Sequence, residues 1–306
     1  MLLREATDRL RAALAGEVRS DEPMSRHTTF RIGGPASIYA VTDTLGELSS
    51  ALHVLADEGT PWVVLGKGSN VLVSDEGYVG AVLVLGREFR RHTVTEDRME
   101  AGAGCTLAAL VQYAFSRGLA GLEFAVGIPG TLGGALVGNA GAREGCIGAI
   151  VESVTLFEPG EGLLRLSGAD IAWGYRTSGL RGRGIIVEGG LRVTPGDRGR
   201  IRHSMETGFA RRKASQPVGV PSAGSVFVNP EGHSAGRLIE SAGMKGARVG
   251  GALVSPVHAN FIVNDGGATA ADVAALIVKV RQAVRDAHGI RLEPEIRFLG
   301  RFDGPA

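Results

Sequence analysis

Apolar residues recur at helical spacing or in short unbroken runs through the first third of the chain. The segment 47–59 carries them at helical spacing and ends on a glycine, so it predicts a helix. Short apolar runs at 61–66 and 81–86 predict strands, and a glycine-rich turn follows the first of them. Helix, strand, turn and strand in close succession indicate an α+β or α/β unit.

The middle of the chain alternates between clear periodic segments and a long glycine-rich stretch. The segment 102–118 predicts a helix, with Thr106 as its N-cap and Gly118 just past its end. The stretch 121–145 is the richest in glycine and has the pattern of neither a long strand nor an ordinary helix. Beyond it, the pattern predicts strands at 152–159 and 184–195 and a helix at 203–217.

The last third of the chain reads as a separate folding unit that begins near Pro217. Its pattern predicts strands at 225–230, 260–264 and 291–300, and helices at 233–243 and 269–289. The last helix has the strongest signals, because Thr269 can cap it, Asp272 can reach back to the cap, and Gly289 ends it. Its apolar stripe consists of Val273, Leu276, Ile277, Val280 and Val284.

Length and charge narrow the class of protein. The chain has 306 residues, enough for two or three domains, and its 44% hydrophobic and 21% charged residues are typical of globular proteins. A formal net charge of +1 argues against a broad nucleic-acid surface and leaves room for a local site for a small anion. Cys105 and Cys146 are not spaced as metal ligands or as a redox pair, so we expect two reduced thiols and no metal site.

No targeting or membrane segment is expected. The first 16 residues carry charges throughout and lack the apolar core of a signal peptide. No window approaches the ~18 uninterrupted apolar residues of a membrane span. We therefore expect a cytoplasmic protein without membrane insertion, and nothing in the sequence indicates an obligatory protein partner.

Glycine is the one strong departure from average composition. The chain has 47 glycines among 306 residues, about twice the usual share of ~7%. They cluster at 66–68, 127–148 and 243–251. Such clusters indicate backbone held close to another group.

Two of these clusters are candidates for binding a phosphate-containing ligand. GKGSN (66–70) directly follows a predicted strand, and successive N–H groups in such a turn can form a nest for phosphate oxygens. It matches neither the Walker A motif nor GxGxxG, and the alternative is a tight strand-to-strand turn. GIPGTLGGALVGNAGA (127–142) removes side chains from one surface, as a flat ring or a diphosphate requires; the alternative is glycine used for close packing between elements.

Some polar residues are candidates for chemistry. Ser225 follows two small residues but lies in no nucleophile elbow, so it is either a turn serine or a proton donor to a strongly basic acceptor. Arg176 and Arg297 are candidates for binding a carboxylate or phosphate. Glu293 and Glu295 are expected on one face of the last strand, where charge in an apolar pattern suggests function.

Read in order, the chain closely resembles the UDP-N-acetylenolpyruvoylglucosamine reductase family, flavoenzymes that make UDP-N-acetylmuramate. Any single matching block is modest, but the blocks together follow the family's order over nearly the whole chain. They are HTTFRIGGPA (27–36), VLGKGSNVLVSD (64–75), GLEFAVGIPGTLGGALVGNAGA (121–142), GYRTS (174–178), PSAGSVFVNP (221–230), AGMKGARVGGALVSPVHANFIVN (242–264) and LEPEIRFLG (292–300).

The resemblance implies an α+β fold in which an FAD-binding domain of the vanillyl-alcohol-oxidase type is joined to a smaller α+β substrate domain. Residues 1–56, joined by 298–306, would form the N-terminal part of the FAD-binding region. Residues 57–217 would form the FAD-binding domain and 218–297 the substrate-binding domain.

The resemblance also implies the reaction. NADPH is the hydride donor, FAD is bound non-covalently, and the substrate is UDP-N-acetylglucosamine enolpyruvate, in peptidoglycan precursor synthesis. Hydride passes through the flavin to the methylene carbon of the enolpyruvyl group. Arg176 and a protonated Glu295 would polarise the carboxylate region, and Ser225 would protonate the neighbouring carbon.

Further site residues follow from the same matching blocks. The expected contacts to the UDP-sugar are Tyr175, Asn229, Lys245, His258, Asn260 and Arg297. The expected FAD-binding residues are Gly66, Lys67, Gly68, Ser69, Asn70, Gly127, Ile128, Pro129, Gly130, Thr131, Gly133, Gly134, Gly138, Asn139, Ala140 and Gly141.

The chain departs from the family pattern at two points, and two other functions stay open. The path from Tyr175 to Ile185 is short and lacks the tyrosine-bearing loop of some members, which indicates the shorter-loop class. Val228 stands where many members carry a basic residue. The alternatives are another FAD-dependent oxidase or dehydrogenase of the same cofactor fold, and a non-catalytic nucleotide-sugar binder.

Overall fold

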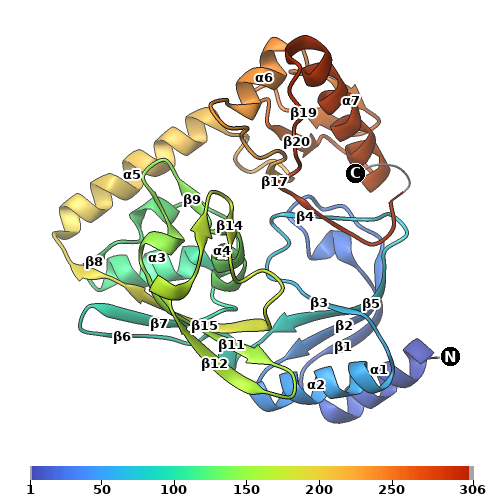
Figure 1. Cartoon of the computed structure of the whole chain (residues 1–306), viewed down its shortest axis with the longest axis vertical. Coiled ribbons are helices and arrows are strands. Elements are labelled where there is room, and N and C mark those ends of the chain that lie inside the picture. The colour runs from blue at the N-terminus through green and yellow to red at the C-terminus, as the bar shows by residue number, and fades with distance from the viewer. Residues whose placement is uncertain (1, 303–306) are drawn as a thin grey trace. The chain divides into compact units, whose positions relative to one another are not determined.

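A computed structural model describes residues 2–302, and within them the chain forms two compact units (Figure 1). Residues 303–306, the end of the segment predicted to join the FAD region, lie outside the described residues. The predicted boundary near Pro217 lies close to the observed transition at Arg212. The first unit comprises the chain up to Ser20, Ile38–Lys67 and Gly80–Arg211, and the second comprises Asp21–Ser37, Gly68–Val79 and the chain from Arg212 onward.

The sequence predicts three parts, whereas the contacts group the chain into two units, whose segments alternate along the sequence. The segments 21–37 and 68–79 join the C-terminal unit, a grouping without a counterpart in the prediction. The GKGSN turn is therefore divided, with Gly66 and Lys67 in the first unit and the rest of the turn in the second.

Most residues of a four-stranded sheet with helices packed beside it belong to the first unit. Its strand order is β1-β2-β5-β3, and β3 pairs with β5 in parallel. Thr44 caps the predicted helix at 47–59 by accepting a hydrogen bond from the Glu47 N–H. The elements are α1 (Leu2–Ala13), β1 (Val18–Pro23), β2 (Pro35–Thr42), α2 (Leu45–Asp57), β3 (Trp62–Val64) and β5 (Tyr78–Leu85).

A five-stranded antiparallel sheet forms the other part of the first unit. Its order is β12-β11-β15-β7-β6, so strands distant in sequence are neighbours. The predicted helix at 102–118 is confirmed with both ends, because Thr106 accepts from the Ala109 N–H and Gly118 adopts a φ of +68°. The elements are β6 (His92–Thr95), β7 (Arg98–Gly102), α3 (Leu107–Ser116), β11 (Val151–Glu158), β12 (Gly162–Ser167) and β15 (Ile185–Arg192), with the short pair β8 (Leu119–Ala120) and β16 (Thr194–Pro195).

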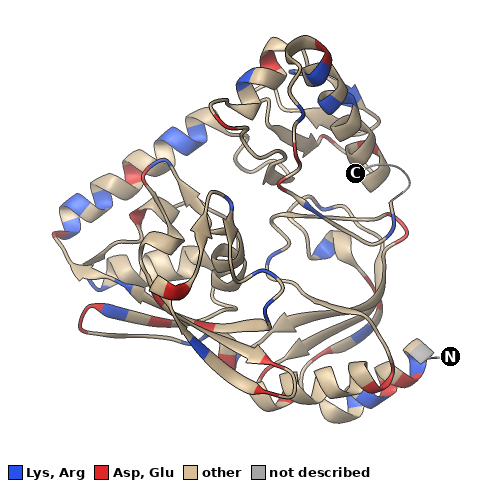
Figure 2. Cartoon of the chain, in the orientation of Figure 1, with Lys and Arg blue, Asp and Glu red and all other residues tan. Residues whose placement is uncertain are grey.

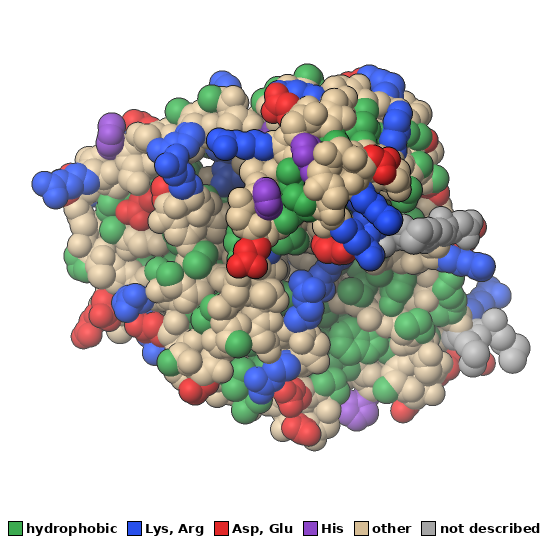
Figure 3. Space-filling view, turned by 45° about the horizontal axis from the view of Figure 1, so that its top comes forward, with side chains coloured by type: hydrophobic (Ala, Val, Ile, Leu, Met, Phe, Trp, Pro, Cys, Tyr) green, Lys and Arg blue, Asp and Glu red, His purple; other side chains and the backbone are tan. Residues whose placement is uncertain are grey.

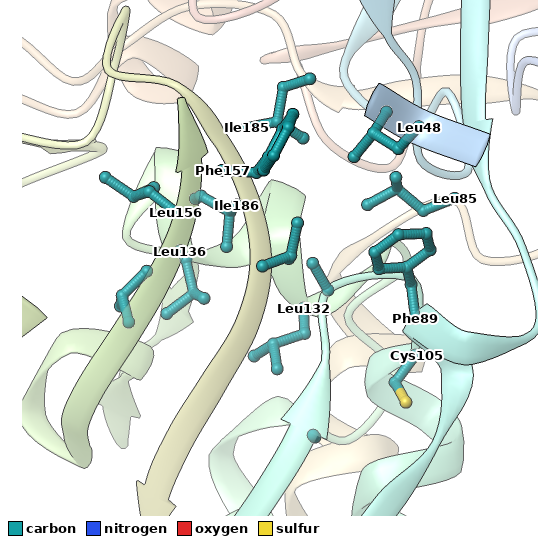
Figure 4. Close-up of a cluster of buried hydrophobic side chains, with 14 of the residues drawn as sticks. Leu48, Leu85, Phe89, Cys105, Leu132, Leu136, Leu156, Phe157, Ile185 and Ile186 are labelled. Atoms are coloured by element: carbon teal, nitrogen blue, oxygen red, sulfur yellow. The ribbon is translucent and has the colours of Figure 1, made fainter. Parts of the chain in front are cut away.

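One continuous apolar core fills the first unit. Figure 4 shows side chains from helices and strands that are far apart in the sequence lying together in it, among them Leu132, Leu156 and Ile186. Burial of such side chains stabilises the unit by about 1.5–3 kcal/mol for each large one. Cys105 belongs to this core, and burial raises the pKa of its thiol to about 11. Both cysteines are free thiols.

The helix α5 (Arg198–Ser215) begins in the first unit, ends in the second and is mostly polar. Ile201 is its buried residue, and Figure 2 shows Lys and Arg along much of its length. It begins earlier than the predicted 203–217, because Asp197 accepts a hydrogen bond from the Arg200 N–H and starts the helix there. Elsewhere on the visible surface, Figure 3 shows basic and acidic side chains interspersed.

The second unit packs two helices beside a four-stranded sheet of order β17-β20-β19-β18. A separate parallel pair joins β4 to β21, with Arg297 opposite Val71. The elements are β4 (Val71–Val73), β17 (Ser222–Ser225), α6 (Ala235–Ser241), β18 (Arg248–Val249), β19 (Ala252–Val254), β20 (Phe261–Asn264), α7 (Ala270–His288) and β21 (Arg297–Leu299).

The predicted features of α7 are confirmed. Thr269 and Asp272 form a capping box, Gly289 ends the helix with a φ of +69°, and the five predicted stripe residues are buried. The predicted strand at 225–230 is wrong in its bounds, because the strand runs earlier and ends at Ser225. The following residues make their main-chain hydrogen bonds elsewhere, as described below. No described helix has the length and apolarity to cross a bilayer.

The capping box gives a test of stability against pH. N–H groups of Thr269 and then Gly251 hold the pKa of Asp272 below its ordinary value of 3.8. A lowered carboxyl pKa in the folded state contributes stability above the unfolded-state pKa, and the contribution disappears as the pH falls through the folded-state pKa. We therefore expect Asp272→Asn to lower the free energy of unfolding at pH 7, with a difference from wild type that shrinks below about pH 4.

Urea unfolding of both proteins between pH 3 and 7 measures this difference. Asp286→Asn, in the last turn of the same helix, is the control for loss of a carboxylate outside the cap. Thr269→Ala should cost about 1 kcal/mol at all these pH values, as expected for loss of a cap hydroxyl. A difference for Asp272→Asn that stays constant with pH would contradict the assigned role of the charge.

Candidate functional site

The GKGSN turn is built so that glycine is required at two of its positions. A Cβ on Gly66 would lie 2.5 Å from Thr131 Oγ1 within the first unit. Gly68 has a φ of +58°, and a Cβ there would lie 2.3 Å from the His27 carbonyl oxygen within the second unit. These glycines therefore serve close packing and a left-handed backbone. The turn keeps Lys67 exposed, so it can still present a cation to a ligand.

The glycines of the 127–142 run divide into two kinds. Those at 133 and 141 pack tightly, since a Cβ on Gly141 would lie 2.6 Å from the Gly145 oxygen and one on Gly133 3.1 Å from the Ala103 Cβ. Gly134 and Gly138 lie in the helix α4 (Leu132–Gly138), and a Cβ on either would meet no protein atom closer than 3.7 Å. Close packing therefore accounts for Gly133 and Gly141, whereas Gly134 and Gly138 face open space and stay candidates for the ligand surface.

Asn139 links this run to the hairpin that carries Arg176. It ends α4 in the left-handed conformation, its Nδ2 donates to the Gly174 carbonyl at 2.8 Å, and its Oδ1 accepts from the Gly148 N–H at 3.0 Å. The short pair β9 (Gly141–Ala142) and β10 (Gly145–Cys146) follows. The side-chain amide of Asn139 is thus buried, and both of its ends are hydrogen-bonded to main-chain groups.

Arg176 occupies an unusual backbone position in a tight hairpin between β13 (Trp173–Gly174) and β14 (Thr177–Ser178). Its φ of +57° is uncommon for a residue with a side chain, and such strain often marks functional positions. Its Nη1 donates to the Gly141 carbonyl at 3.1 Å, and its guanidinium lies 5.5 Å from the ring of exposed Tyr175. The structure therefore brings Arg176 against the glycine run, with Tyr175 beside its guanidinium.

Ser225 lies at a distortion of the second unit's sheet. β17 pairs with β20 at Ser222 and Ser225, but the register shifts between them, and Gly224 has a φ of +76°. A bulge of this kind redirects the side chain that follows it. Ser225 is half-buried at the end of the strand.

Glu295 is tied to the segment after Ser225 through main-chain hydrogen bonds. The Glu295 N–H donates to the Val226 carbonyl at 2.7 Å, and Asn70 Nδ2 donates to the Glu295 carbonyl at 3.1 Å. The Arg297 N–H in turn donates to the Asn70 carbonyl at 2.9 Å. The second unit thus assembles predicted residues from three distant parts of the sequence.

The prediction for Glu293 needs correction. Its side chain is 61% exposed and forms ion pairs with Arg281 and Arg291 on the surface. The last strand begins at Arg297, so the alternation that predicted one shared face for Glu293 and Glu295 does not apply there. Glu295 is half-buried, and its N–H donates to the carbonyl of Val226, the residue after Ser225.

The predicted UDP-sugar residues differ in what they contact. Asn229 Oδ1 accepts from the Ala235 N–H at 2.9 Å, and exposed Lys245 pairs with Glu240 at 2.8 Å. His258 is half-buried, and burial lowers its pKa, so its neutral form is favoured. Its Nδ1 accepts from the Asn260 N–H at 3.2 Å, which leaves the ring proton on Nε2. The amide of Asn260 is buried against Phe227.

Thr29 is a residue of this region that the sequence reasoning left without a role. Its Oγ1 donates to the Ser222 carbonyl at 2.7 Å, its N–H donates to the Gly68 carbonyl, and its carbonyl accepts from the Ser222 N–H. It therefore joins the second half of the GKGSN turn to the strand that carries Ser225. The signal was present in the block HTTFRIGG, which matched the family but carried no assigned contact.

The first unit also has a hollow of about 480 Å³. It lies along α5 and is lined by both acidic and basic side chains, including Glu144, Arg200, His203 and Arg211. Residues 2–302 contain no cluster of three His, Cys, Asp or Glu side chains arranged to hold a metal ion.

Two family models match the chain in separate segments. The model described as "UDP-N-acetylenolpyruvoylglucosamine reductase, C-terminal domain" matches residues 216–299, and the model described as "FAD binding domain" matches residues 36–167. The matched segments include Ser225, Glu295 and both glycine clusters. Arg176 lies between them.

Full-length relatives match over nearly the entire chain. The UDP-N-acetylenolpyruvoylglucosamine reductase of Heliobacterium modesticaldum is 47% identical over 291 residues, which cover 94% of this chain and 93% of that protein. The protein of the same name from Geobacter metallireducens is 45% identical over 292 residues, or 95% of this chain and 97% of that protein.

A comparison with solved structures leads to the same family. The UDP-N-acetylenolpyruvylglucosamine reductase from Thermus caldophilus superimposes with a TM-score of 0.82 at 36% identity, covering 94% of this chain and 99% of that one. The BBE-like 1 protein of Physcomitrella patens, at 13% identity and a TM-score of 0.57, shares the fold alone. The predicted α+β fold with this type of FAD-binding domain is confirmed. The chain therefore belongs to the UDP-N-acetylenolpyruvoylglucosamine reductase family.

Proposed function

We propose that this protein is an FAD-dependent oxidoreductase that uses NADPH to reduce UDP-N-acetylglucosamine enolpyruvate to UDP-N-acetylmuramate. The reaction belongs to peptidoglycan precursor synthesis, and through it to cell-wall biogenesis, cell shape and cell division; the cytoplasm is the expected location. One observation carries the proposal beyond family membership. The segment that follows Ser225 is hydrogen-bonded to the segment that carries Glu295, since the Glu295 N–H donates to the Val226 carbonyl and the Val228 N–H donates to the Glu293 carbonyl.

The residues of the first unit fit an FAD. Gly134 and Gly138 leave an uncovered backbone surface that a Cβ would occupy, as a flat ring system or a diphosphate requires. The left-handed backbone at Gly127 and Gly130 precedes that surface, with φ values of +72° and +127°. When bound, FAD supplies the capacity to accept hydride from NADPH and to pass it to the enolpyruvyl group. Lys67 is the cation of the GKGSN turn that would face its phosphates.

The two kinds of glycine give a test of this fit that does not depend on turnover. We expect Gly134→Ala to leave the protein without FAD as stable as wild type or up to about 1 kcal/mol more stable, because alanine favours a helix. The same change should weaken FAD binding at least about tenfold, since the new methyl group occupies the ligand's surface. Thermal unfolding without FAD and a fluorescence titration with FAD measure the two effects.

Gly133→Ala is the matched control in the same helix. Its Cβ would lie 3.1 Å from the Ala103 Cβ, so it should lower the stability of the protein whether or not FAD is present. Equal FAD affinities for wild type and Gly134→Ala would remove Gly134 from the binding surface.

The second unit supplies the proton. Hydride addition to the methylene carbon leaves an electron pair on the carbon that bears the ether oxygen, delocalised into the carboxylate. The Ser225 O–H donates its proton to that carbon, the electron pair becomes the new C–H bond, and the serine alkoxide recovers a proton from solvent. A hydroxyl is a weak acid in water, but the carbon it protonates is far more basic, so the transfer is favourable.

Arg176 and Glu295 act on the carboxylate region of the substrate. A guanidinium can pair with a carboxylate through two N–H groups and stabilises the charge that spreads into it. A protonated Glu295 donates a hydrogen bond to the same region and polarises it further. These interactions strengthen as charge develops, which is the condition for a contribution to rate rather than to binding alone.

The visible spectrum of the purified protein tests the proposal directly. We expect a flavin spectrum that bleaches on anaerobic addition of NADPH and returns on addition of UDP-N-acetylglucosamine enolpyruvate. A flavin that bleaches but returns only with oxygen would indicate an oxidase of the same cofactor fold. A protein that stays colourless after reconstitution with FAD would indicate a nucleotide-sugar binder.

A further inference from the structure

Asn260 makes an unusual pair of hydrogen bonds to the segment that follows Ser225. Asn260 directly precedes β20, and the residue is 4% exposed. Its Oδ1 accepts from the Phe227 N–H at 3.0 Å, and its Nδ2 donates to the Phe227 carbonyl at 2.8 Å. One amide thus satisfies both buried main-chain groups of one residue, as a neighbouring strand would do.

The fold needs this contact because the sheet pairing is interrupted there. β17 pairs with β20 up to Ser225, opposite Phe261, across a register shift. The Val226 N–H then donates to the Asn260 carbonyl at 2.8 Å. Main chain and side chain of Asn260 therefore continue, over Val226 and Phe227, the pairing that the strand itself no longer provides.

The opposite edge of the same segment holds the second chemical group. The Val226 carbonyl accepts from the Glu295 N–H at 2.7 Å, and the Val228 N–H donates to the Glu293 carbonyl at 2.9 Å. The segment 226–228 thus lies between Asn260 and 293–295. A shift of the Phe227 peptide would therefore displace Ser225 and Glu295 together.

We propose that Asn260 is a positioning residue, which fixes the segment that orients Ser225 and Glu295, and that it does not contact the UDP-sugar. This replaces the expectation from the sequence, where Asn260 is a substrate contact. The burial of its amide and the use of both its ends favour the positioning role. The inference rests on the proposed function of Ser225 and Glu295.

Single-turnover kinetics of Asn260→Ala and Asn260→Asp separate the two roles. For positioning, we expect the rate constant of flavin reoxidation at saturating enolpyruvyl substrate to fall about 10–100-fold, as for a small misplacement of reacting groups. The rate of flavin reduction by NADPH and the apparent Kd of the enolpyruvyl substrate should stay within about twofold of wild type. A raised Kd with an unchanged saturating rate would mean that Asn260 is a substrate contact and would overturn the inference.

The two variants differ in how much of the contact they remove. Asn260→Ala leaves both main-chain groups of Phe227 buried without partners, which lowers stability. Asn260→Asp keeps the acceptor for the Phe227 N–H and loses the donor to its carbonyl, so it should fold more readily and show the smaller rate effect. The rate constants are those of the folded molecules alone. Partial unfolding therefore lowers the amplitude of the absorbance change and leaves the rate constants unchanged.

Asn264→Ala is the matched control on the same strand. Asn264 Nδ2 donates to the Phe30 carbonyl at 3.2 Å and its Oδ1 accepts from Gly266 and Ala268, away from Ser225. We expect it to lower the stability without changing the saturating reoxidation rate. A rate loss equal to that of Asn260→Ala would mean that any weakening of β20 has this effect, and the specific role of Asn260 would be wrong.

Hydrogen exchange gives a readout independent of turnover. In the FAD-loaded protein, a peptide covering 222–229 should exchange faster in Asn260→Ala than in wild type, whereas peptides from α7 should not. Unchanged exchange at 222–229 would overturn the proposal that the Asn260 side chain clamps Phe227, even if the proposed function holds. Conversely, wild type that is not reoxidised by the enolpyruvyl sugar refutes the proposed function, and the exchange experiment still decides whether Asn260 holds the segment.

Discussion

The Ser225→Ala variant is expected to be reduced by NADPH at nearly the wild-type rate and to be reoxidised by the enolpyruvyl substrate about 10²–10⁴-fold more slowly. The reason is that only the second half-reaction requires a proton at carbon. The main chain of Ser225 is held opposite Phe261, so alanine removes the hydroxyl while the backbone keeps its partner. Anaerobic stopped-flow absorbance of the flavin measures the two half-reactions separately.

Ser222→Ala is the control for this experiment, because it removes a hydroxyl from the same strand at the other side of the bulge. Its two half-reactions should both remain close to wild type. If Ser225→Ala slowed reduction and reoxidation equally, the residue would act on the flavin environment or on folding, and its assignment as proton donor would be wrong.

The Glu295→Gln variant should slow the second half-reaction by up to the about 10²–10³-fold that loss of one hydrogen-bond donor to developing charge costs, because its amide N–H₂ is a weaker donor than a carboxylic acid. The amide keeps the size of the side chain and cannot act as a carboxylic acid toward the substrate. The hydrogen bonds that place residue 295 come from its own N–H and carbonyl, to Val226 and Asn70, so the substitution leaves them in place. Reduction by NADPH should change much less.

Glu293→Gln makes the identical chemical change two positions away. Because Glu293 is exposed and in surface ion pairs, this variant should alter neither half-reaction and should change the free energy of unfolding by less than about 1 kcal/mol. Equal kinetic effects of the two substitutions would show that net charge near the C-terminal strand, and not the acid at 295, governs the rate.

Local signals in the sequence were sufficient to predict a helix where residues close in sequence cap its ends. The ends of α3 and α7 were predictable from Thr106, Gly118, Thr269 and Gly289, because caps and left-handed C-terminal glycines depend on residues within one turn. The buried stripe of α7 followed from its spacing for the same reason. The start of α5 was predicted too late, although the Asp197 cap signal was present.

Glycine density revealed a backbone-lined region but not the task of each glycine. The packing role of Gly66 depends on Thr131, and that of Gly68 on His27, and neither pair is close in sequence. Gly134 and Gly138 cannot be told from closely packed glycines in the sequence, but they face open space. Only the folded chain distinguishes a glycine that admits a neighbour from one that leaves room for a ligand.

By itself the sequence determined the α+β class, the main helices, the glycine-rich region and, through matching blocks, the family with its candidates Arg176, Ser225 and Glu295. The tertiary structure decided which of these lie together. Asn70 reaches Glu295 across 225 positions of sequence and Asn260 reaches Phe227 across 33, and side-chain hydrogen bonds of this kind leave no periodic trace in the residues between. For that reason the end of β17 at Ser225, the separation of Glu293 from Glu295 and the clamp on Phe227 could be known only from the fold.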